Sequence, residues 1–157
     1  MSLIFSRQCE YALQAVVYLA LRREGERTSI RDLTKKLDIP YHFLAKILQQ
    51  LARKGLLRSS KGPTGGFALR VDAGEIRLLD IVEALDGLAP YQQCASGLAE
   101  CNDDMPCSMH DSWVALRTRI IDYLERNTIA DLVKALEMKR KNLAKQRKPR
   151  RVVAGRR

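Results

Sequence analysis

The 157-residue chain lacks any long apolar run. A helix that spans a bilayer needs about 18 or more consecutive apolar residues, and no such stretch occurs. The opening residues MSLIFSRQCEYAL also lack the basic region and long apolar core of a signal peptide. We therefore expect no membrane partner and a cytoplasmic location. In that compartment cysteine thiols stay reduced and serve as ligands or redox groups rather than as disulfides.

Acidic residues are missing from two parts of the chain. Residues 138–157 hold ten of the 28 Lys and Arg and none of the 18 acids, so the rest of the chain is balanced. Within that balanced part, residues 39–71 contain six basic residues and no acid, whereas residues 72–111 contain nine acids and one Arg. This segregation predicts one basic face for a polyanion and a separate acidic sensing loop.

The apolar pattern of the first half predicts helices followed by a hairpin. Helical spacing indicates helices over 9–21, 29–37 and 41–54, and two short helices around a tight turn are the core of a helix-turn-helix. The period then changes, and 56–60 and 67–71 are typical of strands joined by the turn sequence KGPTGG. The expected fold is mainly α with a small β-hairpin: a winged helix-turn-helix.

The second half is predicted to be helical around a cysteine-rich loop. Helices are expected over 76–85, 110–127 and 128–133, and the second of these carries an apolar stripe of Trp113, Leu116, Ile120, Tyr123 and Leu124. Such a stripe is either core or a dimer seam, and we favour the seam because the remaining body is too small to cover a long helix. We thus divide the chain into a DNA-binding domain (1–74), a sensor and dimerisation region (75–137) and a disordered basic tail (138–157).

Three of the four cysteines lie between Cys94 and His110, which is one of only two histidines. Six residues separate Cys94 from Cys101, five separate Cys101 from Cys107, and two separate Cys107 from His110. Three thiolates and one nitrogen match either an iron-sulfur cluster or tetrahedral zinc, and the lack of a Cys-x2-Cys pair modestly favours the cluster. Buried reduced thiols with an unrelated histidine are the plain alternative. We expect no enzyme, because no third group that would orient a Cys107–His110 pair is recognisable.

These segments resemble the winged-helix iron-sulfur transcriptional regulators related to IscR, NsrR and CymR, the Rrf-type family. The resemblance covers about 3–133 and leaves the basic tail unmatched. The matching strings are EYAL from Glu10, LARKGL from Leu51, KGPTGGFAL from Lys61, IVEALDG from Ile81, and the three-cysteine loop.

The resemblance implies a homodimer that binds promoter DNA and whose affinity is adjusted by a cluster on Cys94, Cys101 and Cys107. It leaves the fourth ligand open between His110, as in IscR-like members with a [2Fe-2S] centre, and Glu10, as in NsrR-like members with a [4Fe-4S] centre. We favour His110 and [2Fe-2S]. The family's usual cysteine gaps are five and five, so the gap of six after Cys94 departs from the pattern. Cys9 has no ligand role in it, and we expect it to pack in the core.

DNA contacts are predicted on the third helix and the wing. In the family the third helix enters the major groove and the wing reaches the minor groove. On this chain we assign the outward helix face to the major groove, Lys61 and Thr64 to the minor groove, and Arg58 and Ser59 to further contacts. The outward face of the helix carries Tyr41, His42, Ala45, Lys46 and Gln49. The alternative function is a winged-helix regulator with a zinc or thiol redox switch and no cluster.

Overall fold

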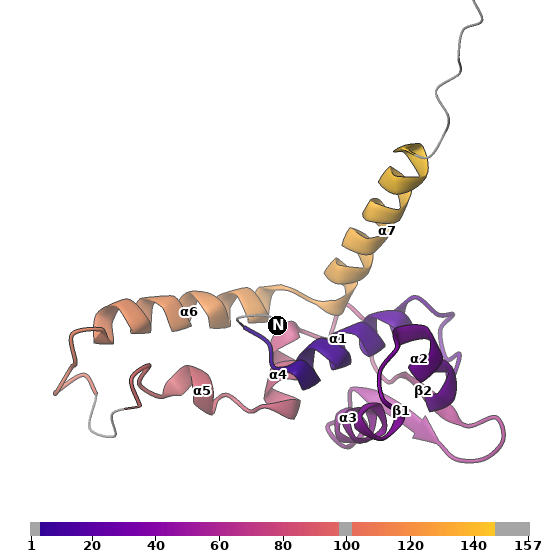
Figure 1. Ribbon diagram of the computed structural model, residues 1–157, viewed down its shortest axis with the longest axis horizontal. Coiled ribbons are helices and arrows are strands. Elements are labelled where there is room, and N and C mark those ends of the chain that lie inside the picture. The colour runs from indigo at the N-terminus through magenta and orange to yellow at the C-terminus, as the bar shows by residue number, and fades with distance from the viewer. Residues whose placement is uncertain (1–3, 98–101, 147–157) are drawn as a thin grey trace, which may run out of the picture.

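The computed structural model describes residues 4–97 and 102–146 (Figure 1). The described chain is mostly helical, with a single two-stranded antiparallel sheet in that part. The mainly α class with a small hairpin is therefore as predicted.

The first three helices form the predicted helix-turn-helix. They are α1 (Arg7–Ala20), α2 (Ile30–Leu37) and α3 (Tyr41–Arg53). The Ser29 hydroxyl caps α2 by accepting the backbone N–H of Asp32 at 3.1 Å, which satisfies a donor that the helix start would leave open. Asp38 takes the left-handed conformation and turns the chain toward α3. The inward faces of α1 and α3 supply much of the core, including Ala12, Val16, Leu44, Leu48 and Leu51.

The wing consists of β1 (Leu57–Ser60) and β2 (Gly66–Leu69), with Leu57 opposite Leu69 and Ser60 opposite Gly66. Thr28, just before α2, extends this sheet by exchanging two 2.9 Å backbone hydrogen bonds with Phe67. A side chain cannot fit at Gly65, because its Cβ would lie 2.4 Å from the Ser60 carbonyl oxygen. The start of β2 is thus tied to the segment directly before α2.

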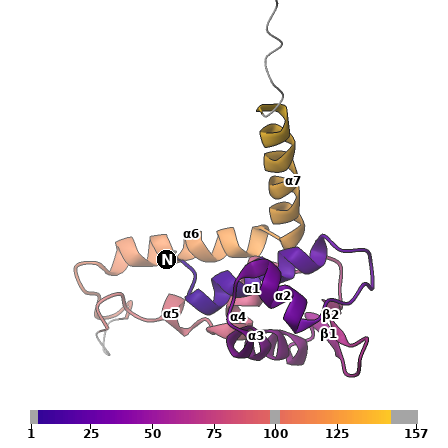
Figure 2. The same ribbon diagram turned by 45° about the vertical axis from the view of Figure 1, so that its right-hand side comes forward.

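The C-terminal elements are α4 (Leu78–Leu85), α5 (Ala89–Gln92), α6 (His110–Arg126) and α7 (Ile129–Gln146). Helix α4 packs against α1, α3 and α6, and α7 packs against α1. Figures 1 and 2 both show the loop before α6 at one end of the molecule and the β1–β2 loop at the other. Helix α4 lies between these two ends.

Three features differ from the sequence expectations. The short helix α5 was not expected, since four residues carry no readable period. Helix α7 continues to Gln146, well beyond the predicted end of this helix at Val133, so residues 138–146 of the expected tail are helical, while 147–157 lie outside the described residues. The stripe of α6 is divided: Leu124 is fully buried in the core, whereas Leu116 and Tyr123 are about half exposed.

Among the described residues, no helix is both long enough and apolar enough to cross a membrane.

Candidate functional site

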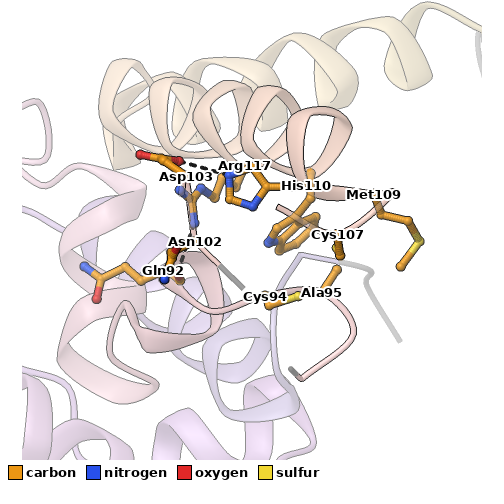
Figure 3. A pocket seen from close by; sticks show the side chains of 10 residues that line it. Gln92, Cys94, Ala95, Asn102, Asp103, Cys107, Met109, His110 and Arg117 are labelled. Atoms are coloured by element: carbon orange, nitrogen blue, oxygen red, sulfur yellow. Dashed lines mark hydrogen bonds and ion pairs between the residues drawn. The ribbon is translucent and has the colours of Figure 1, made fainter. Parts of the chain in front are cut away.

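A pocket of about 210 Å³ lies where the cysteine-rich loop meets the start of α6. The side chains of Cys94, Cys107 and His110 all line it, as do Asn102 and Asp103 (Figure 3). Cys94 and Cys107 are both half-buried. The structure therefore brings together two of the three predicted thiol ligands and the predicted imidazole.

Two hydrogen bonds join α6 to the segment before Cys94 on the opposite side of this pocket. The indole Nε1 of Trp113 donates to the Gln93 carbonyl oxygen at 2.8 Å, and the Arg117 guanidinium donates to the Gln92 carbonyl oxygen at 2.9 Å. Both bonds join α6 to the end of α5, directly before Cys94. They fix the distance between the helix that carries His110 and the segment that carries Cys94.

The ring of His110 is oriented by a carboxylate. Its Nε2 lies 3.0 Å from Asp103 Oδ1, and the imidazole is only 12% exposed while Asp103 is almost fully exposed. Asn102 shapes the same turn by accepting the backbone N–H groups of Asp104 and Met105 at 3.0 and 2.9 Å. A carboxylate that holds one ring nitrogen is the common second partner of metal-binding histidines.

Of the two remaining predicted ligands, the structure describes only Glu10. Cys101 is outside the described residues, directly before Asn102. Glu10 stands in the first turn of α1, where it forms a 3.9 Å ion pair with Arg7, and it is not among the residues that line the pocket. Within 4–97 and 102–146, no three His, Cys, Asp or Glu side chains converge as a metal site.

The sequence reasoning missed a polar cluster around Asp86, at the end of α4. Its carboxylate accepts hydrogen bonds from Ser6 Oγ at 2.9 Å, Gln8 Nε2 at 2.6 Å and Cys9 Sγ at 3.0 Å. Burial pushes the pKa of Asp86 upward, but these donors outweigh it and hold the pKa below its ordinary value. No sequence pattern marks the cluster, because its members are nearly 80 residues apart.

The predicted DNA contacts lie on the surface. On α3, Tyr41, His42, Lys46 and Gln49 are exposed and Ala45 is half-buried, opposite the buried Leu44, Ile47 and Leu48. On the wing, Arg58, Ser59, Lys61 and Thr64 are exposed. Helix α3 is also joined to α4, because Gln50 Nε2 donates to the Ala84 carbonyl oxygen at 2.8 Å. The assignment of each residue to a groove stays a prediction.

Residues 5–135 match the Rrf2 family profile, which is described as an iron-dependent transcriptional regulator. The chain belongs to the Rrf2 family. A proposed HTH-type transcriptional regulator of Aquifex aeolicus is 36% identical over 133 residues, which cover 83% of this chain and 92% of that protein. The regulator IscR of Vibrio campbellii is 29% identical over 128 residues, covering 82% of this chain and 76% of IscR.

Solved structures of other Rrf2 regulators share the fold. CymR, the global cysteine regulator of B. subtilis, superposes with a TM-score of 0.70 at 23% identity, covering 85% of this chain and 98% of CymR. IscR of T. potens gives the same TM-score and identity, covering 88% of this chain and 92% of IscR. The family resemblance and the winged-helix fold inferred from the sequence are thereby confirmed. The chain is a transcriptional regulator and not an enzyme, as expected.

Proposed function

We propose that this Rrf2 regulator is a homodimer whose affinity for promoter DNA is modulated by an iron-sulfur cluster held by Cys94, Cys101, Cys107 and a fourth ligand. The observation that carries the proposal is the shared pocket of Cys94, Cys107 and His110. Two soft sulfur donors and one nitrogen around a pocket of about 210 Å³ suit iron in a cluster. Cys101 adjoins Asn102, which lines the same pocket.

We propose His110 as the fourth ligand and [2Fe-2S] as the cluster type. His110 lines the pocket with both thiols and its ring is oriented by Asp103, whereas Glu10 lies on α1 beside Arg7. A cluster bound here would supply reversible one-electron chemistry, with a potential raised by nitrogen ligation. The residues of this chain supply the positioning, through the hydrogen bonds of Trp113 and Arg117 to the α5 segment.

DNA binding is assigned to α3 in the major groove and to the wing loop in the minor groove. The exposed face of α3 carries donors that reach base edges, among them Lys46 and Gln49. Lys61 and Thr64 stand at the exposed tip of the wing, and Arg58 and Ser59 on its first strand. The Gln50–Ala84 bond joins α3 to the C-terminal end of α4, and this same end leads into α5 and the cysteine loop. We expect cluster state to change DNA affinity by about 1 to 3 kcal/mol through such contacts.

The deciding experiment is spectroscopy of protein purified without oxygen. A cluster gives a coloured protein with visible absorption and a Mössbauer spectrum that reports its type. Replacing Cys94, Cys101 or Cys107 by Ala should abolish the absorption, whereas Cys9→Ala, the matched control, should leave it unchanged, since Cys9 is fully buried away from the pocket.

The fourth ligand is tested by two further variants. We expect His110→Ala to leave a labile cluster with a shifted potential, because a nitrogen ligand raises the potential and makes it sensitive to protons. Glu10→Ala should leave the spectrum intact. The reverse result, an unaffected His110→Ala protein and a bleached Glu10→Ala protein, would assign the ligand to the carboxylate.

The second candidate is a zinc or thiol redox switch without iron. It is favoured by the two cysteines that line one pocket and by the likeness to CymR of Staphylococcus aureus, whose oxidised form has been solved and matches with a TM-score of 0.66 at 26% identity. Colourless protein that contains zinc, or that gains a Cys94–Cys107 crosslink on mild oxidation, would establish this candidate and exclude the cluster.

A further inference from the structure

Three arginines surround one small residue on the outer face of the wing sheet. Arg58 on β1 stands directly opposite Ala68 on β2. The bridge between Thr28 and Phe67 places Arg27 beside Ala68 from the other side. Side chains opposite one another in an antiparallel pair share a face, and residues two apart in a strand share a face too. Arg70 follows Ala68 by two residues. Arg27, Arg58 and Arg70 thus belong to the same face of the wing sheet.

The same three arginines line a groove of about 540 Å³ beside the end of α3. Its remaining walls are Ala52 at the end of α3, Leu57, and the hydroxyl-bearing Ser59 and Ser60 of β1. The Arg70 guanidinium reaches over Gly55, where an added Cβ would lie 3.9 Å from it. The Ser60 Oγ is buried here and has no hydrogen-bond partner in the described part of the chain.

No carboxylate within the groove balances this positive charge. Over 4–97 and 102–146, Arg27, Arg58 and Arg70 form no ion pair within 4.0 Å. The three arginines also line an adjoining hollow with Glu24, Glu26 and Asp72. There Glu26 is paired with Arg22 at 3.7 Å, and Asp72 accepts the Gly74 N–H at 2.7 Å. Like charges facing one another across strands destabilise a sheet, so an anion that fills the groove would relieve the repulsion.

We propose that Arg27, Arg58 and Arg70 form a phosphate clamp that grips the DNA backbone beside the segment read by α3. A guanidinium presents two parallel N–H donors that match the oxygens of a phosphodiester. The occupant is DNA because the groove adjoins the end of α3 and the first wing strand, and because residues 39–71 contain no acid that would repel the duplex. The proposal rests on the DNA-binding function and adds Arg27 and Arg70 to its contacts.

The test is the salt dependence of binding to a labelled duplex of mixed sequence, measured by fluorescence anisotropy. Arg27→Ala and Arg70→Ala should each lower the slope of log affinity against log salt by about one and weaken binding roughly tenfold at low salt. The charge-keeping Arg27→Lys and Arg70→Lys variants should keep the slope but bind more weakly than wild type, because lysine lacks the fork. Lys134→Ala on α7 is the control for net charge, and it should change neither quantity.

Thermal melting separates the clamp from a structural role. All three arginines are exposed, so the alanine variants should melt at or above the wild-type temperature once the repulsion is removed. If the lysine variants bind as tightly as wild type, positive charge alone accounts for the binding and the guanidinium clamp is overturned. A second outcome would also overturn the clamp: Arg27→Ala and Arg70→Ala proteins keep the wild-type slope of log affinity against log salt, while Lys61→Ala binds DNA more weakly. In that case DNA binding by the wing would still stand. Wild-type protein that fails to bind any duplex would instead overturn the DNA-binding function.

Discussion

The three cysteines that the structure describes have different surroundings. Cys9 is fully buried on α1, and its Sγ donates to Asp86. Cys94 and Cys107 are half-buried and line the pocket that they share with His110. Burial and the contact with Asp86 raise the pKa of Cys9 from 9.0 to about 12. Its predicted role in packing is confirmed by its place in the core. The neutral, enclosed thiol of Cys9 is therefore a poor nucleophile and a poor metal ligand.

This contrast predicts selective alkylation. In reduced, metal-free protein at neutral pH, iodoacetamide should modify the half-buried Cys107 readily and Cys9 only after unfolding, as peptide mass spectrometry would show. The folded state also holds the Cys9 proton to higher pH than the unfolded chain, so its contribution to stability is complete below about pH 9 and is lost as pH rises toward 12. Cys9→Ala should weaken this alkaline loss. Rapid labelling of Cys9 in native protein would contradict the packing.

Single residues on α3 should differ in how they affect recognition. Lys46→Ala or Gln49→Ala should cost about 1 to 3 kcal/mol on the operator if the side chain reads a base edge, whereas Arg58→Ala should weaken all sequences alike. Binding to an operator selected from random duplexes, compared with a scrambled duplex, measures both effects. An unchanged footprint after combined Lys46 and Lys61 replacement would show that neither the α3 face nor the wing reads DNA as proposed.

Among the elements, α7 is longer than the sequence indicated. Lys and Arg beyond residue 137 suggested a mobile tail, yet the helix continues to Gln146. Its first turns pack on α1, and Leu132, Leu136, Lys139 and Arg140 line a groove with Leu13 and Val17 of that helix. Long basic side chains lay their methylene stems along such apolar surface, which a charge count does not register.

Two truncations separate charge from structure at this end. Ending the chain after Gln146 removes six of the ten basic residues and should flatten the salt dependence of non-specific DNA binding, with unchanged melting temperature. Ending it after Glu137 also removes Lys139 and Arg140 from the α1 groove and should lower the melting temperature by a few degrees. Footprinting on the operator is the control. A footprint lost when the chain ends after Gln146 would show that 147–157 are needed for specific binding.

At the scale of the whole molecule, the main feature is the separation of the cysteine-rich loop from the wing. They lie at opposite ends of the described chain, with α4 between them (Figure 1). The end of α4 is held by Gln50 of α3 at Ala84 and by the α1 cluster at Asp86, and the Tyr91 hydroxyl of α5 donates to the Ile4 carbonyl oxygen at 2.7 Å. We therefore expect a shift of the cysteine loop to act on elements that also support α3.

Dimerisation is predicted at the exposed part of α6. Leu116 and Tyr123 are 51% and 48% exposed, and Leu124 is the one fully buried residue of α6, so most of this helix is uncovered in the single chain. We expect wild-type protein to sediment as a dimer and the Leu116→Glu, Tyr123→Glu protein as a folded monomer. Leu143→Glu on α7, where the leucine is 60% exposed, is the matched control. A dimer that survives both α6 substitutions would place the seam elsewhere.

The sequence by itself determined the winged helix and the position of the cysteine-rich loop. Local signals were sufficient there: Ser29 and Asp32 begin α2, glycines shape the wing turn, and apolar spacing marks the inward face of α3. These features depend on residues a few positions apart, for which periodicity and turn chemistry are reliable guides. The clustering of Cys94, Cys107 and His110 is likewise visible as a concentration of ligand types.

The tertiary structure decided whatever depends on residues distant in sequence. It placed Cys9 against Asp86, joined Gln50 to Ala84, buried Leu124 while leaving Leu116 exposed, and gathered Arg27 with Arg58 and Arg70. A helical stripe shows which residues share a face but not which neighbour covers it, because coverage depends on how elements pack. For the same reason the acid-free segment 39–71 could suggest a basic face, but only the pairing of Thr28 with Phe67 brought Arg27 onto it.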